Sequence, residues 1–100
     1  ANTSVGTSFT TILDFSTLNT NQCKGFYLVT VVAEGSYVGT HGVYLVGLST
    51  WSAVYLYETL TESTNVSAQV SGANFQVKLS SGSNTLHATG IPIGITGFDS

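Results

Sequence analysis

The chain has 100 residues, of which 42% are hydrophobic and only 7% are charged, and its formal net charge is −3. This length fits one domain, and the hydrophobic content is high enough for a core, which excludes an intrinsically disordered chain. Apart from its histidines, the chain has only Lys24 and Lys78 as cationic side chains, so it lacks the clustered Lys and Arg of a nucleic-acid or anionic-membrane surface. We therefore expect a single domain over residues 1–100, with no nucleic-acid partner and no membrane insertion.

Hydrophobic side chains recur with a period of two along the chain, which predicts β-strands rather than helices. The first apolar run, residues 9–15, places four alternate side chains on one face, namely Phe9, Thr11, Leu13 and Phe15. The next three apolar runs differ from it, because they are hydrophobic at both odd and even positions and so have two apolar faces. These runs are residues 25–34, 42–49 and 51–60.

The second half of the chain has a different pattern. Residues 66–71 and 75–80 alternate between apolar and polar side chains, which predicts strands with one wet face, and the Ser-Gly-Ala-Asn sequence at 71–74 predicts a hairpin between them. A short strand is expected near residues 85–89. The apolar tail that follows contains Pro92 and three glycines, so we expect an edge strand or an irregular segment packed on a neighbour.

Seven or eight short strands separated by turn signals predict an all-β fold, an antiparallel β-sandwich or jelly roll. In a monomeric sandwich each strand needs one apolar face, whereas residues 25–60 offer two. No helix is predicted that could cover the second face, so we expect another copy of the chain to do so. The residues expected at this oligomer interface are Phe26, Leu28, Val32, Tyr44, Val46, Leu48, Ile91, Ile93 and Ile95.

Catalytic and metal-binding patterns are sparse. His41 and His87 are 46 positions apart, and neither has a carboxylate within four residues, so no metal site is expected. Glu58 and Glu62 are the pair of carboxylates closest in sequence. We favour the interpretation that they are solvent-exposed charges at the end of a strand over the interpretation that they are the two catalytic carboxylates of a glycosidase. No nucleophile elbow, phosphate-binding glycine loop or Cys-x-x-Cys motif occurs. We expect a non-enzymatic protein without a cofactor, with the glycosidase kept as the weakest hypothesis.

Aromatic residues form the one cluster with a positive argument for ligand binding. Trp51, Tyr55 and Tyr57 share a parity, and Tyr37 and His41 lie in the glycine-rich segment before an earlier strand. An exposed aromatic row can bind a sugar, because the CH face of a pyranose packs on the ring. Trp and Tyr are also enriched at subunit interfaces, and we favour the interface over the ligand site.

The chain is β-rich, rich in Gly, Ser, Thr and Asn, and almost uncharged. This composition extends over the segment CKGFYLVTVVAEGSYVGTHGVYLVGLSTWSAVYLYETL, the one-sided runs NVSAQV and NFQVKLS, and the Gly/Ile-rich tail. Over nearly the whole chain they resemble distal C-terminal domains of bacteriophage tail fibres and tailspikes. The resemblance implies a homotrimeric β structure at the tail of a virion, which locks three chains together, binds a host-surface receptor or assists trimer folding. It implies no catalytic residues, because the carboxylates of tailspikes usually lie in a separate, larger β-helix domain.

We therefore expect a non-enzymatic trimerisation and receptor-binding domain whose partners are copies of itself and a host cell-surface polysaccharide. One alternative is a monomeric carbohydrate-binding module of a secreted protein, which would use Trp51, Tyr55 and Tyr57. Another is an intramolecular chaperone for trimer folding. Within the leading hypothesis, the strands of residues 25–60 should lie at the subunit contacts, and the hairpin of residues 66–80 should face water.

Overall fold

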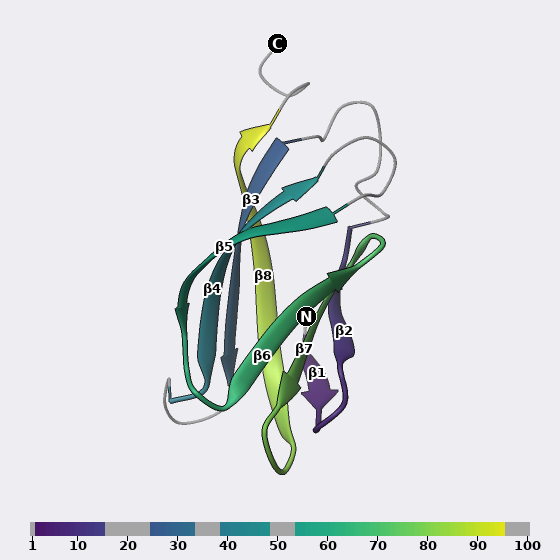
Figure 1. Cartoon of the computed structure of the whole chain (residues 1–100), viewed down its shortest axis with the longest axis vertical. Helices are drawn as coiled ribbons and strands as arrows, with labels where there is room; N and C mark the ends of the chain where they lie inside the picture. The colour runs from purple at the N-terminus through teal and green to yellow at the C-terminus, as the bar shows by residue number, and fades with distance from the viewer. Residues whose placement is uncertain (1, 16–24, 34–38, 49–53, 96–100) are drawn as a thin grey trace.

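A computed structural model describes residues 2–15, 25–33, 39–48 and 54–95, which form two antiparallel sheets (Figure 1). The strands are β1 (Asn2–Val5), β2 (Thr10–Asp14), β3 (Gly25–Ala33), β4 (His41–Leu48), β5 (Val54–Glu62), β6 (Val66–Ser71), β7 (Asn74–Leu79) and β8 (Asn84–Ile95). Five of them form the large sheet, in the order β1-β8-β3-β4-β5, and three form the small sheet, in the order β2-β7-β6. The predicted all-β class is confirmed, in an arrangement compatible with a β-sandwich. Among the described residues there is no helix long and apolar enough to span a bilayer.

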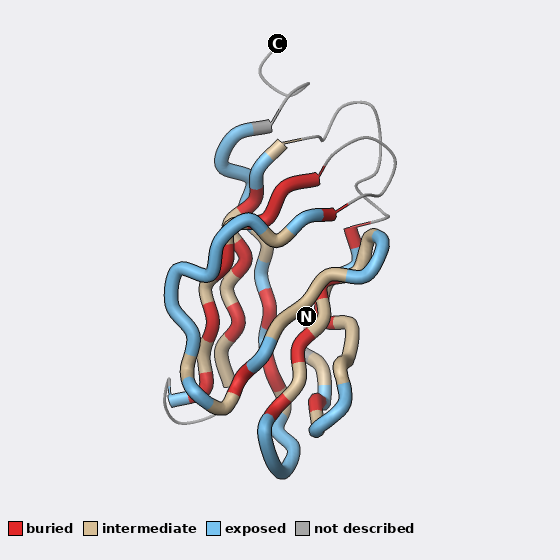
Figure 2. The backbone as a smooth tube through the Cα atoms, in the orientation of Figure 1, coloured by how far each residue is buried: buried red, intermediate tan, exposed pale blue. Residues whose placement is uncertain are grey.

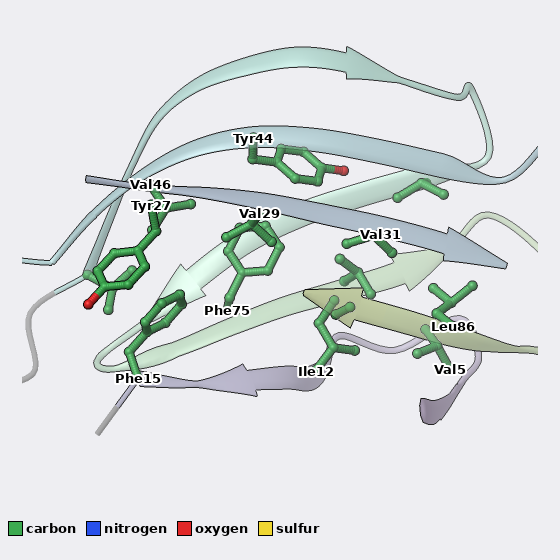
Figure 3. Packing of buried hydrophobic residues seen from close by; sticks show 14 of the residues in the cluster. Val5, Ile12, Phe15, Tyr27, Val29, Val31, Tyr44, Val46, Phe75 and Leu86 are labelled. Carbon is green, nitrogen blue, oxygen red and sulfur yellow. The ribbon is translucent and has the colours of Figure 1, made fainter. Parts of the chain in front are cut away.

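The core lies between the inner faces of the two sheets. Buried residues alternate with more exposed ones along β3, β4 and β7 (Figure 2), as side chains on a pleated strand must. Tyr44 of the large sheet packs against Phe75 of the small sheet, with ring centroids 5.1 Å apart (Figure 3). Phe15, directly after β2, packs edge-on against Tyr27 at 5.3 Å. Tilted and edge-on contacts are favourable for aromatic rings, so these two pairs join the sheets.

β4 has two apolar faces, and the structure corrects our assignment of them. Tyr44, Val46 and Leu48 were expected at an oligomer interface, and this prediction was wrong, because they are 0%, 0% and 3% exposed within the single chain. Alternation shows that a strand has two apolar faces, but it does not tell which of them meets the partner sheet. The small sheet covers the face of β4 that carries Tyr44, and Val43 and Leu45 lie on the opposite face of the strand.

β2 corresponds to the first predicted strand but not to its predicted face. Its pairing with β7 shifts by one residue between Thr11 and Leu13, so Ile12 forms a β-bulge. Ile12 is buried together with Phe15, although a strict period of two would place them on opposite faces. The prediction of one uninterrupted apolar face over residues 9–15 was therefore wrong.

β6 and β7 form the predicted hairpin, with a two-residue loop between Ser71 and Asn74. The first loop residue, Gly72, has a φ of 60°, the positive value that tight hairpin turns require at this position. On the outer side of the hairpin, Gln69 Nε2 donates a hydrogen bond of 2.8 Å to Gln76 Oε1. The prediction of one polar face on these strands is confirmed.

β8 differs most from the sequence prediction. It is one strand of 12 residues between β1 and β3, whereas a short strand and a separate edge or irregular segment were expected. Its long pairing with β3, from Leu86 to Ile95, holds the two parts in one strand. β1 pairs only with Asn84–His87, so Pro92 lies in a part of β8 that has β3 alone as its neighbour among the described residues. Proline is tolerated at such an edge.

Candidate functional site: the outer face of the large sheet

The outer face consists of the side chains of β8, β3, β4 and β5 that point away from the small sheet. Strand register arranges them in four rows across the sheet, which we name by their content. The rows are Gly94, Phe26, Gly47 and Tyr55 (the aromatic row); Ile91, Leu28, Leu45 and Glu58 (the aliphatic row); Thr89, Thr30, Val43 and Thr61 (the threonine row); and His87, Val32 and His41 (the histidine row). The face therefore changes from apolar at one end to polar at the other, and its rows hold one carboxylate and no lysine.

Large apolar side chains are exposed at the apolar end of the outer face. Five of them on or beside this face are 43–59% exposed in the single chain: Phe26, Tyr55, Tyr57, Ile91 and Ile93. Single exposed apolar residues are normal on soluble domains, but contiguous groups of them mark interaction surfaces. The outer face is therefore the candidate site of this chain.

Three of these residues, Phe26, Tyr55 and Tyr57, form an aromatic cluster. The ring centroids of Phe26 and Tyr57 are 5.4 Å apart in an edge-on arrangement, and those of Tyr55 and Tyr57 are 6.2 Å apart. Gly47 lies between Phe26 and Tyr55 in the aromatic row and makes room for the Tyr57 ring. A Cβ atom at Gly47 would lie 2.4 Å from Tyr57 Cε2. The glycine thus lets the tyrosine ring lie on the sheet and meet Phe26.

A hollow of about 90 Å³ lies beside this cluster, and its lining includes Gly25, Phe26, Gly47, Leu48 and Tyr57. Pockets that enclose small-molecule ligands are larger, roughly 300–1,000 Å³. The hollow is too small to enclose a sugar ring. The aromatic cluster is suited instead to contact across a surface, either with the face of a sugar or with another protein.

The predicted ligand residues are only partly brought together. Tyr55 and Tyr57 lie side by side and exposed, as predicted for an aromatic row, whereas Tyr37 and Trp51 lie outside the described residues. His41 begins β4, six residues before Gly47, which corresponds to about 20 Å along a strand. The grouping of His41 with the tyrosines was therefore wrong.

Phe26, which we expected at an oligomer interface, takes the place that we had predicted for His41 beside the tyrosines, since its ring contacts that of Tyr57. The sequence signal that could have shown this is Gly47, because a glycine in a two-faced strand leaves room for a neighbouring ring. The two hypotheses, interface and ligand site, thus concern one surface.

The other predicted interface residues lie on the large sheet with different exposures. Ile91 and Ile93 are about half exposed, and Leu28 and Val32 are partly buried by their neighbours on the outer face. The side chain of Ile95 lies outside the described residues. That these residues contact another subunit stays a prediction.

A polar network fixes the start of β4 at the far end of the outer face. The backbone N of His41 donates to Ser63 Oγ (3.0 Å), and Ser63 N donates to the carbonyl of His41 (2.9 Å). Asn65 completes the network, because its Oδ1 lies 2.7 Å from Ser63 Oγ and its Nδ2 donates to Thr40 Oγ1 (2.9 Å). The His41 ring approaches β5, with Nε2 3.4 Å from Thr61 Oγ1. The corner between β5 and β6 therefore holds His41 in place.

Glu58 and Glu62 do not form a catalytic pair. Glu58 lies opposite Leu45 on the outer face, whereas Glu62 lies opposite Gly42 and accepts a 2.7 Å hydrogen bond from the Tyr44 hydroxyl on the inner side. Burial, and then the hydrogen bond and negative charge of Glu62, raise the pKa of Tyr44 above its usual range. Carboxylates on opposite faces of one strand cannot flank one glycosidic bond. No group of three or more metal-ligating side chains occurs within the described ranges.

Comparisons of the chain with protein-family models, with curated proteins and with solved structures found no match.

Proposed function

We propose that this chain is a non-enzymatic trimerisation domain at the distal end of a fibre of the bacteriophage tail type. Three copies pack through the outer faces of their large sheets, and the trimer presents a receptor-binding surface to a host cell-surface polysaccharide. The observation that carries the assembly is the apolar outer face, with exposed Phe26, Tyr57 and Ile91 around the partly buried Leu28 and Leu45. The threefold order, the virion and the polysaccharide come from the resemblance to tail fibres.

The charge of the outer face favours a second copy of the chain as its partner. Glu58, at the β5 end of the aliphatic row, is the one acidic side chain in the four rows, so the face offers no pattern for an acidic or basic partner. An apolar and nearly uncharged face is complementary to itself. Burial of such surface stabilises an assembly by roughly 25 cal/mol per Å² before the costs of association.

The edges of the large sheet are less suited to assembly than its outer face. The β4–β5 register shifts twice, between Val43 and Tyr44 and between Leu45 and Val46, and β8 contains Pro92 beside a further shift. Bulges and proline discourage the addition of a strand to a sheet edge. These features favour assembly through the outer faces over the addition of a strand at a sheet edge.

A lysine at the centre of the outer face tests the proposed assembly. Leu28→Lys introduces a charge that would be buried without a partner in the trimer, so we expect a folded monomer by size-exclusion chromatography with light scattering. The matched control is Gln76→Lys, at the centre of the small sheet's outer side, which should stay trimeric. Equal masses for the two variants would contradict the proposed interface.

A second candidate function is carbohydrate binding by the aromatic cluster in a monomeric module. It is favoured by the exposed rings of Tyr55 and Tyr57, which are 50% and 59% exposed, beside the hollow. Tyr57→Ala would then abolish retention on an immobilised polysaccharide and leave the molecular mass unchanged. If Tyr57→Ala lowers the mass instead, the cluster belongs to the subunit interface.

A further inference from the structure

Two β-bulges lie at opposite sides of the outer face, and each adds a large apolar side chain. The register of β8 against β3 shifts beside Phe26, and the extra residue on β8 is Ile93. The register of β5 against β4 shifts beside Leu45, and the extra residue on β5 is Tyr57. Their side chains are 54% and 59% exposed in the single chain. A bulge re-aims a side chain, and neither of these side chains belongs to the buried core, so the core does not explain the two bulges.

The surroundings of Tyr57 provide a hollow, and β8 provides a projecting side chain. Tyr57 lines the hollow of about 90 Å³ together with Phe26 and Gly47. A core cavity of about 150 Å³ takes up benzene, so the hollow suits about three or four carbon atoms, as at the end of an isoleucine side chain. On β8, Ile93 lies beside Gly94, where even an added Cβ atom would meet nothing within 4 Å. The two sides of the outer face are therefore complementary in shape as well as apolar.

The projecting side chain and the hollow lie at the same height along the strands. The aromatic row joins Gly94, the neighbour of Ile93, to Gly47 in the lining of the hollow. β8 and β5 are three strand spacings apart, roughly 14 Å, so the two sides of one copy do not meet each other. Copies around a closed symmetry axis repeat without a shift along it, so one side of a copy can meet the other side of the next copy at the same height.

We propose that Ile93 of one copy inserts into the hollow beside Tyr57 of the next copy, so that three identical head-to-tail contacts close the trimer. This inference rests on the proposed trimer. An isologous contact, in which both copies offer the same patch, closes at two copies, whereas a head-to-tail contact can close a ring of three. The aromatic row and the described lining of the hollow hold no charged side chain, so the insertion desolvates no charge among them.

A third bulge provides a matched control position. The register of β5 against β4 shifts again beside Val43, and the extra residue is Leu60, which is 53% exposed. Leu60 adjoins Thr61 of the threonine row, away from the described lining of the hollow. It therefore matches Ile93 in exposure and in its place at a bulge, but it should take no part in the proposed contact.

Light scattering over a dilution series, with circular dichroism to check folding, compares the two positions. Ile93→Ala removes three carbon atoms from the contact, so we expect each copy to be incorporated up to about 60-fold more weakly. Leu60→Ala removes the same number of carbon atoms and should weaken assembly by a much smaller factor. Equal weakening by the two variants would contradict the insertion of Ile93.

Cross-linking tests whether the contact joins the two sides of the outer face. In a Cys23→Ser background, which removes the only native cysteine, Gly94→Cys and Tyr55→Cys place one thiol on each side and keep Ile93 and Tyr57. A bismaleimide shorter than the roughly 14 Å between the two sides should convert the double variant into a covalent trimer on a denaturing gel. Each single variant should remain monomeric on that gel, because like thiols do not meet in a head-to-tail contact.

The control for cross-linking is Gly94→Cys/Gln76→Cys, whose second thiol lies on the outer side of the small sheet and should not react across copies. If Gly94→Cys alone gives covalent dimers, or if the double variant is trimeric by light scattering but is not cross-linked, the head-to-tail contact is wrong although the trimer stands. A monomer or a dimer for the unmodified chain by light scattering overturns both the trimer and the contact.

Discussion

The outer sides of the two sheets are built from opposite kinds of side chain. On the small sheet, Gln76 donates from Nε2 to Thr11 Oγ1 (3.1 Å) and accepts at Oε1 from Gln69 Nε2 (2.8 Å), so hydrogen-bonded polar side chains cross all three strands. On the large sheet, the corresponding central positions are Leu28 and Leu45. Both sheets bury an apolar inner side in the same core. The fold therefore needs only the inner sides, and the apolar outer face of the large sheet requires another explanation.

The largest expected effect separates inner from outer positions. Phe75→Ala removes a fully buried ring that packs on Tyr44, so we expect the free energy of unfolding to fall by about 3–5 kcal/mol. Leu28→Ala, on the outer face, should cost the single chain clearly less and should mainly weaken assembly. Urea unfolding at low protein concentration measures both. Equal losses would mean that the outer face belongs to the core of the single chain, and the contrast between the sheets would fail.

A smaller effect is expected from the polar pair on the inner side of β4. Tyr44→Phe removes the hydrogen bond to Glu62, so the free energy of unfolding should fall by about 1 kcal/mol at neutral pH. Because the folded chain keeps the Tyr44 proton more tightly than the unfolded chain, this residue contributes stability that is complete below about pH 10 and declines above it.

The decline attributable to Tyr44 should reach at most about 1.4 kcal/mol at pH 11. It is read as the difference between the unmodified chain and Tyr44→Phe in urea titrations from about pH 8 to about pH 11. Parallel pH profiles for the two proteins would show that Tyr44 is not shielded in the folded chain.

The smallest effect on stability is expected at Gly47, on the outer face. Gly47→Ala places a Cβ atom where the Tyr57 ring lies, and the exposed ring can swing away, so the loss should stay near or below about 1 kcal/mol. The near-ultraviolet circular dichroism of the aromatic cluster should nevertheless change. Gly94→Ala is a matched control in the same row, because a Cβ atom there meets nothing within 4 Å. Identical spectra for both variants would contradict the described cluster.

Period-two alternation predicted the class of fold and most strands, because each strand needs at least one apolar side. It could not tell which side of β4 meets the small sheet, since Tyr44 and Leu45 are both apolar. It also failed at the bulge of Ile12, where the register of β2 against β7 overrides the local pattern. These errors arise because pairing partners lie far apart in the sequence.

The candidate site depends on the same distant pairings. Tyr55 and Tyr57 could be predicted as neighbours from their own strand. Phe26 joins them only through the β3–β4 register and the gap at Gly47. The histidine row needs the pairing of β3 with both β4 and β8, so a spacing of 46 residues gave no sign of it.

Sedimentation equilibrium of the unmodified chain at neutral pH, over a dilution series through the micromolar range, tests the central claim most directly. Packing through the apolar outer face predicts a mass three times the 10.4 kDa of one chain, falling toward that of one chain only on strong dilution. Twice the chain mass would retain an interface but contradict the threefold order. A mass of one chain at every concentration would contradict assembly through the outer face.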